Sequence, residues 1–370
     1  MKDKKKIVII IIILILILTG YYVYKKDLLS NLFKEKVTTV TNKEVTVTDK
    51  GIADAVDKLY DATVIVEVGN NSDQISGWGS GFVYKTDSKY GYILTNHHVI
   101  EDARYIKVVS TNEKEVEGTL IGSDKYMDVA VVRVPLDSVQ KVASIGKSEN
   151  LRLGDTVFTV GTPVSTNYSF TVTRGILSGK NRLCEMSSSN NQLYQYSQES
   201  WYINLLQIDA SINGGNSGGP LANSNGEVVG ITNSKLTSYY SSSTIENMAF
   251  AIPIEDAINI AEQLLEDGEV TRPLLGVSTA EVDDAVSAGL ISNYNSKGAV
   301  VIKVADDSVA DKAGLEEGDI ILKLGDYEVT NTKYLKYYLY RYNVGDTVKI
   351  TYQRNGKSKT VDVKLTDEAK

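Results

Sequence analysis

The stretch that decides how this sequence is interpreted is Gly215-Asn216-Ser217-Gly218-Gly219-Pro220. A serine nucleophile needs a sharply turned backbone that exposes its Oγ and brings N–H groups to one point, and glycines permit that turn. The predicted oxyanion hole spans Gly215, Asn216 and Ser217, with the N–H groups of Gly215 and Ser217 as donors. A plain glycine-rich turn between strands is the alternative, and the Pro-Leu pair and apolar strand that follow favour the nucleophile.

The candidate base lies upstream, where His97 and His98, the two histidines of the chain, follow an apolar strand predicted at Tyr92–Thr95. Neighbouring residues of a strand point to opposite faces, so the two imidazoles would not readily share a metal ion. If a histidine activates Ser217, it is one of these two. The residues alone do not decide which.

Asp128 is the candidate third member, at the start of the apolar strand Val129–Val134. A carboxylate there is expected to be partly buried and to need a partner, which an imidazolium supplies. Asp124 also fits a strand-entry turn and remains an alternative. His, Asp and Ser then follow one another in the chain order of the chymotrypsin-type triad.

Short apolar strands, separated by glycines and polar turns, fill the region from Ala62 to about Ile254. Strands at this density predict a β-barrel or sandwich rather than a parallel α/β fold. Residues 181–202 interrupt the pattern and are expected to form a polar loop. An amphipathic helix at Ile254–Leu265 closes this domain, which we place at residues 51–270.

A second compact domain is predicted for residues 271–368, after the boundary marked by Arg272-Pro273. Its pattern contains strands at Gly298–Val304 and Ile320–Leu324 and a helix near Thr332–Tyr342.

The N-terminus begins with lysines and continues as an apolar run from Ile7 to Tyr24. At about 1.5 Å per residue, such a helix is long enough to cross a hydrocarbon core roughly 30 Å thick. Because the denser lysines precede the run, residues 1–6 are predicted to stay cytoplasmic, residues 7–24 to span the membrane and residues 25–50 to form a linker. A cleaved signal peptide is the alternative, although no Ala-x-Ala-like site follows the run.

Charge and cysteine content exclude several other classes of function. The net charge of −8 argues against nucleic acid as a main partner, because phosphate binding requires a basic surface. The single cysteine, Cys184, excludes an internal disulfide and a multi-cysteine zinc site. No metal or cofactor is predicted.

Together these segments resemble a membrane-anchored serine protease of the HtrA (Deg) family, over about residues 51–368. Four segments carry the resemblance, and they are Gly79–Val83, Tyr92–Val99, Asp128–Val132 and Gln207–Leu221. A fifth segment, Ala249–Pro253, resembles the stretch that closes the protease domain of that family. The resemblance implies a mainly β protein, with a chymotrypsin-like double β-barrel followed by an α+β PDZ domain.

The resemblance also assigns individual residues. The family pattern Thr-Asn-x-His-Val implies His98 as the base, and the family supports Asp128 as the acid. Ile212 is implied to line a small apolar S1 pocket. Gly214 and Ala249 stand where the family often has proline and glycine, which bears on substrate preference and activation.

The C-terminal domain resembles a PDZ domain, with Leu274-Leu275-Gly276-Val277 as its carboxylate-binding loop. A peptide C-terminus would then add as a strand to a sheet edge, held by Leu275, Gly276 and Val277. The whole resemblance implies a bacterial serine endopeptidase, forming homotrimers, that degrades unfolded or damaged proteins outside the cytoplasmic membrane. A proteolytically silent PDZ-containing chaperone or stress sensor is the alternative.

Overall fold

The computed structural model describes residues 11–25, 50–72, 74–187, 200–234, 247–292 and 297–367. The chain divides into two units, Met1–Thr48 and Asp49–Lys370. The described part of the first unit is a helix over residues 11–25. Within the described ranges, no helix combines the length and the apolar character needed to cross a membrane. Residues 7–10 of the span predicted at 7–24 lie outside those ranges.

The second unit begins with a helix and a closed six-stranded barrel. Its strands follow the order β1-β2-β3-β6-β5-β4, each antiparallel to its neighbours. Valine and isoleucine side chains fill its interior, as expected of β-branched residues on a pleated surface. The elements are α2 (Lys50–Leu59), β1 (Thr63–Gly69), β2 (Ile75–Thr86), β3 (Tyr90–Thr95), α3 (His97–Ile100), β4 (Tyr105–Ser110), β5 (Glu115–Asp124) and β6 (Val129–Pro135).

A second closed barrel follows, with the strand order β10-β11-β12-β9-β8-β7. The two closed barrels confirm the predicted double-barrel architecture. The second barrel is built from β7 (Thr156–Gly161), β8 (Thr171–Ser187), β9 (Ser200–Ile208), β10 (Pro220–Asn223), β11 (Val228–Asn233) and β12 (Ala249–Pro253).

The predicted loop at residues 181–202 is wrong at both of its ends. β8 continues to Ser187 and β9 begins at Ser200, and the two strands pair from Arg182↔Leu205 to Ser187↔Ser200. The polar side chains on this part of β8 hide the alternation that marks a strand, and pairing with a distant segment decides the structure. Residues 188–199 lie outside the described ranges.

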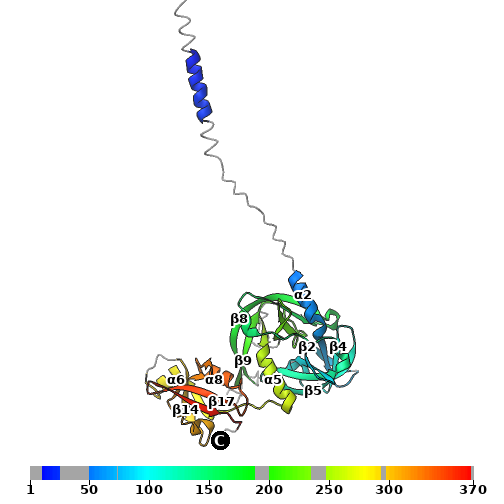
Figure 1. Ribbon diagram of the computed structural model, residues 1–370, viewed down its shortest axis with the longest axis vertical. Coiled ribbons are helices and arrows are strands. Elements are labelled where there is room, and N and C mark those ends of the chain that lie inside the picture. The colour runs from blue at the N-terminus through cyan, green and yellow to red at the C-terminus, as the bar shows by residue number, and fades with distance from the viewer. Residues whose placement is uncertain are drawn as a thin grey trace, which may run out of the picture. The chain divides into compact units, whose positions relative to one another are not determined.

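The two barrels share one apolar core, which joins Phe82 and Leu94 of the first to Phe158 and Ile231 of the second. Helix α5 (Ile254–Asp267) contacts β5 and β6 of the first barrel and β11 and β12 of the second. Figure 1 shows α5 beside β5. Gly268 ends this helix in the left-handed conformation, with its N–H bonded to the carbonyl of Leu264. The predicted helix at Ile254–Leu265 is therefore confirmed.

The C-terminal domain is a sheet in the order β13-β14-β15-β17-β18, with β16 paired to β15. Strand β13 lies at one edge of this sheet and β18 at the other. The domain has its own apolar core, which includes Leu275, Leu335 and Leu339. Its elements are β13 (Val277–Glu281), α6 (Val282–Ser287), β14 (Ala299–Val304), α7 (Val309–Lys312), β15 (Ile320–Leu324), β16 (Tyr327–Glu328), α8 (Thr332–Leu339), β17 (Thr347–Arg354) and β18 (Lys357–Lys364).

Candidate active site and peptide-binding groove

Ser217 lies in the glycine-rich turn that leads into β10, and its backbone is tied to the first barrel. The N–H of Ser80 in β2 donates to the carbonyl of Ser217 at 2.7 Å. Gly215 and Gly218 have positive φ angles of 100° and 84°. An added Cβ would lie 2.1 Å from Thr162 O at Gly215 and 2.2 Å from Ser80 O at Gly218. Both positions therefore require glycine, and these glycines turn the chain at Ser217.

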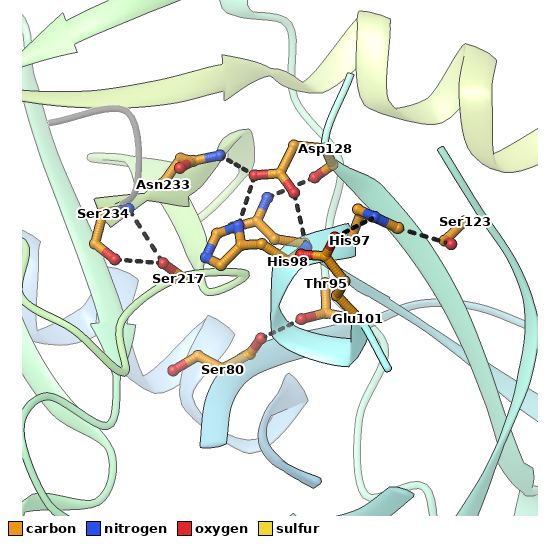
Figure 2. Close-up of polar contacts among 11 residues, drawn as sticks. Ser80, Thr95, His97, His98, Glu101, Ser123, Asp128, Ser217, Asn233 and Ser234 are labelled. Carbon is orange, nitrogen blue, oxygen red and sulfur yellow. Dashed lines mark hydrogen bonds and ion pairs between the residues drawn. The ribbon is translucent and has the colours of Figure 1, made fainter. Parts of the chain in front are cut away.

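His98 and Asp128 are joined by two hydrogen bonds. His98 lies in α3, directly after β3, and Asp128 directly precedes β6. The Nδ1 of His98 lies 2.7 Å from Asp128 Oδ2, and the N–H of His98 donates to Asp128 Oδ1 at 2.9 Å. Figure 2 shows the imidazole between Asp128 and Ser217, with its other edge facing the serine. The carboxylate is thus placed to orient the imidazole.

Asn233, which the sequence analysis did not identify, also contacts this pair. It ends β11, and its Nδ2 donates to Asp128 Oδ2 at 2.6 Å. The Nδ2 of Asn96 donates to the backbone carbonyl of Asp128 at 2.7 Å. Burial by itself raises the pKa of Asp128, but the hydrogen bonds and charge of His98, with the bond from Asn233, outweigh it and hold the pKa below its ordinary value. Asp128 is therefore a carboxylate at neutral pH.

The hydroxyl of Ser217 is bonded to Ser234, a second residue that the sequence analysis missed. The N–H of Ser234 donates to Ser217 Oγ at 3.1 Å, and the two Oγ atoms lie 2.6 Å apart (Figure 2). Within the described ranges, Ser217 Oγ makes no hydrogen bond to His98. If the N–H and the hydroxyl of Ser234 both donate to Ser217 Oγ, the hydroxyl proton of Ser217 stays available for a bond to His98 Nε2.

The alternative residues of the sequence analysis have other partners. The Nδ1 of His97 lies 2.9 Å from Ser123 Oγ, and its Nε2 lies 3.9 Å from Glu101 Oε1. Asp124 accepts from the N–H of Met127 at 2.8 Å and pairs with the Arg272 guanidinium at 2.7 Å. The geometry therefore places His98 and Asp128, rather than His97 and Asp124, beside Ser217.

The peptide planes of the turn are fixed from outside it. The carbonyl of Gly214 accepts from Val164 N–H at 2.8 Å, which turns the N–H of the same peptide, that of Gly215, the opposite way. The buried Ser80 Oγ donates to Gly215 O at 2.8 Å and accepts from Thr162 N–H at 3.1 Å. In the described part of the chain, the N–H groups of Gly215 and Ser217 have no acceptor.

Two further predicted site features have less geometry to support them. The N–H of Asn216 donates to Asn213 O at 3.0 Å, so it is not free to bind an oxyanion. Ile212 is partly buried against the apolar core of the second barrel. The described residues contain no group of three or more acidic, histidine or cysteine side chains able to hold a metal ion.

The C-terminal domain carries a groove between α8 and β13, with a volume of about 490 Å³. Leu275 O accepts from Ala310 N–H at 3.0 Å, and Gly276 O accepts from Ala305 N–H at 2.8 Å. Within the described ranges, the N–H groups of Leu275 and Gly276 have no acceptor. Leu275, Gly276 and Val277, which the sequence analysis predicted to bind a carboxylate, all line the groove. Free amides beside an unpaired strand edge suit a peptide C-terminus.

Comparison with protein families gives two matches, one in the region of the two barrels and one in the C-terminal domain. The model of the trypsin-like peptidase domain matches residues 79–231. The model of the PDZ domain matches residues 273–365. The first match contains His98, Asp128 and Ser217, and the second contains the groove.

Individual proteins match along most of the chain. The serine protease Do-like HtrA of Lactococcus lactis subsp. cremoris is 39% identical over 302 residues, which cover 80% of this chain and 72% of that protein. A probable periplasmic serine endoprotease, DegP-like, of Pseudomonas putida is 36% identical over 299 residues, covering 80% of this chain and 57% of the relative. A solved structure of the HtrA-type protease AlgW with tripeptide has a TM-score of 0.64 at 28% identity, covering 85% and 96% of the two chains.

Proposed function

The chain belongs to the HtrA family of serine proteases, and on that premise we propose that His98, Asp128 and Ser217 are the catalytic residues of its endopeptidase activity. The observation that carries this assignment is the imidazole of His98, which lies between Asp128 and Ser217 and is bonded to the carboxylate at 2.7 Å. Asp128 keeps the imidazole in the tautomer whose Nε2 accepts a proton.

In the proposed reaction, Ser217 Oγ attacks the scissile carbonyl carbon while His98 Nε2 takes the hydroxyl proton. Asp128 stabilises the imidazolium that forms. The tetrahedral intermediate then breaks its C–N bond, and His98 gives the proton to the leaving amine. Water then attacks the acyl-enzyme while His98 takes one of its protons. The ester bond to Ser217 Oγ breaks, His98 returns the proton to that oxygen, and the second product leaves as a carboxylic acid.

The proposed oxyanion hole consists of the N–H groups of Gly215 and Ser217. The fixed orientation of the Gly214–Gly215 peptide and the absence of an acceptor for either N–H within the described ranges support this pair. One such donor typically contributes about 10²–10³-fold in kcat. Asn216 is left out of the pair because its N–H is bonded within the turn. Ile212 stays the predicted wall of the S1 pocket.

The proposed substrates are unfolded or damaged proteins outside the cytoplasmic membrane, a role in protein quality control. A relative named as a periplasmic endoprotease supports the extracytoplasmic location. The apolar run from Ile7 to Tyr24, preceded by lysines, supports a membrane anchor with a cytoplasmic N-terminus. The groove at Leu275, Gly276 and Val277 is proposed to hold peptide C-termini. The homotrimer stays a prediction.

A silent sensor is the alternative, and relatives named as serine proteases do not favour it. One contact of the nucleophile is the reason to test it. The hydroxyl of Ser217 is bonded to Ser234 and not to His98 within the described ranges. Catalysis requires a hydrogen bond from Ser217 to His98, and such bonds often form only when substrate binds. The sensor proposal requires that this bond never forms.

Cleavage of an unfolded substrate distinguishes the two candidates. The full chain is expected to degrade a casein-like protein, and Ser217→Ala is expected to lose that activity by at least about 10³-fold, since the nucleophile is absent. Ser234→Ala, which removes a neighbouring hydroxyl but leaves the nucleophile, is the matched serine variant and is expected to retain cleavage. Full activity of Ser217→Ala rules out the assignment, and no cleavage by the unmodified chain under any condition favours the sensor.

A further inference from the structure

We propose that the groove between α8 and β13 prefers, among the peptide C-termini that it accepts, those that carry carboxylate side chains at the three residues before the terminal one. This rests on the proposed function of the groove as a site for peptide C-termini. It adds the chemical class of the peptide, which follows from the side chains that line the groove.

The apolar end of the peptide is specified by three leucines. Leu275, Leu335 and Leu339 line the groove, and each is more than nine-tenths buried in the domain core. Leu335 and Leu339 are four residues apart on α8, so they lie on one face of the helix. A terminal side chain beside this face is surrounded by hydrocarbon, which favours an apolar residue.

The charge of the groove is opposite in sign to that of the chain. Among the described residues that line it, the charged side chains are Lys303 and Lys336, and no aspartate or glutamate is present. The chain as a whole carries a net charge of −8. Positively charged side chains on the lining of an acidic protein therefore favour negative charge in the groove.

The two lysines approach the groove from different walls. Lys336 belongs to α8 and directly follows Leu335. Lys303 belongs to β14, where it pairs in register with Ser278 of the edge strand β13. A peptide added beside β13 would point successive side chains to opposite sides. Carboxylate side chains at neighbouring positions of the peptide therefore point to different sides, one toward Lys303 and the other toward Lys336.

The preference is expected to be moderate and sensitive to salt. Exposed ion pairs change affinity by about two- to fivefold each, so two pairs give roughly four- to 25-fold. Because Lys303 is exposed and Lys336 is half-buried, much of this preference is screened when the ionic strength rises to about 1 M. Burial of the apolar end is not screened.

The test measures peptide binding by the full chain carrying Ser217→Ala, so that the peptides are not cleaved. Fluorescein-labelled decapeptides ending in valine carry aspartate and glutamate, asparagine and glutamine, or lysine at the three preceding positions. Fluorescence anisotropy is expected to give the order acidic, neutral, basic from tightest to weakest, with the gap closing in high salt. An acidic peptide with an amidated C-terminus separates groove binding from binding at the protease site.

Charge reversal tests the two lysines directly. Lys303→Glu is expected to weaken the acidic peptide about fivefold or more and to strengthen the basic peptide. Lys336→Gln is expected to weaken the acidic peptide about two- to fivefold and to weaken the neutral peptide less. Lys357→Glu is the matched control, because Lys357 is exposed on β18, at the sheet edge opposite β13. Thermal unfolding of each variant establishes that it is folded.

The outcomes separate the two proposals. Equal affinity for acidic and neutral peptides, with the amidated peptide unbound, overturns the charge preference and leaves the groove as a site for C-termini. Failure of every free-carboxylate peptide to bind overturns the proposed function of the groove as well. An equal effect of Lys357→Glu and Lys303→Glu also overturns the proposal, because it shows a response to net charge alone.

Discussion

His98 and Asp128, from the first barrel, are held through hydrogen bonds to their side chains, whereas Ser217, from the second barrel, is held through the shape of its backbone. Each barrel contributes to both, because Asn233 of β11 bonds Asp128 and Ser80 of β2 bonds the Ser217 carbonyl. The carboxylate of Asp128 accepts hydrogen bonds from the N–H and Nδ1 of His98 and from Nδ2 of Asn233. Each donor lies within 2.9 Å of a carboxylate oxygen. The Ser217 turn is set by glycine conformations and by hydrogen bonds to its carbonyl groups. The acid–base pair thus depends on the chemistry of two side chains, and the nucleophile depends on peptide orientation.

This difference predicts that substitutions on the two sides fail in different ways. On the side of His98 and Asp128, an isosteric change that keeps the shape should still remove activity. On the side of Ser217, changes that leave every catalytic side chain intact should remove activity by moving the backbone.

The largest effect is expected from Asp128→Asn. The amide keeps the size of the side chain but favours the wrong imidazole tautomer, which lowers kcat by about 10⁴-fold in triads of this type. Steady-state kinetics on a fluorogenic peptide measure kcat and KM separately, and KM should change little. A loss of less than about tenfold shows that Asp128 does not orient His98.

Gly215→Ala is expected to follow, with kcat lower by about 10²–10³-fold, because a Cβ 2.1 Å from Thr162 O forces the turn open and removes an oxyanion donor. Gly214→Ala is the matched control, since nothing lies within 4 Å of an added Cβ there. The comparison fails if the two alanine variants have the same kcat.

Ser80→Ala is expected to lower kcat by about tenfold. The change leaves the carbonyl of Gly215 and the N–H of Thr162 without their buried partner, at a cost of roughly 1–3 kcal/mol, part of which appears as misorientation of the turn. Ser123→Ala removes a hydroxyl that contacts His97 instead and should leave kcat unchanged. A change in KM with constant kcat excludes a role for Ser80 in the oxyanion hole.

The smallest effect concerns acid stability. Because the folded pKa of Asp128 is lowered, its carboxylate stabilises the fold above the unfolded pKa near 3.9, and this contribution is lost as the pH falls through the folded pKa. The difference in free energy of unfolding between the unmodified chain and Asp128→Asn should therefore shrink below about pH 4, by roughly 1.4 kcal/mol per unit of pKa lowering. Urea unfolding of both proteins at pH 7, 5 and 3 measures this difference in free energy of unfolding. A difference that grows on acidification contradicts a lowered pKa for Asp128.

Much of the fold is visible in the sequence because it is local. The apolar strands of both barrels and helix α5 show their period within a few residues. The pairing of β8 with β9 was missed because polar residues such as Arg182 and Glu185 resemble loop residues. Only the pairing of Arg182 with Leu205 and of Glu185 with Tyr202 makes this segment a strand.

The site could be predicted in part for the same reason. Ser217 sits in a glycine-rich motif, so its turn is encoded nearby. Asn233 lies 105 residues from Asp128, and Ser80 lies 135 residues from Gly215. Single polar residues with such distant partners carry no local signal. For Asn233 and Ser234 the one clue was their position at the end of a buried strand that follows the glycine-rich turn.

The central claim, that His98 rather than His97 activates Ser217, is tested most directly by labelling with a serine-reactive fluorophosphonate. The unmodified chain, His98→Ala and His97→Ala are compared, and the labelled peptide is identified by mass spectrometry. Labelling is expected at Ser217 in the unmodified chain and in His97→Ala, and to be lost in His98→Ala. Loss of labelling in His97→Ala with retention in His98→Ala, or labelling at another serine, contradicts the account.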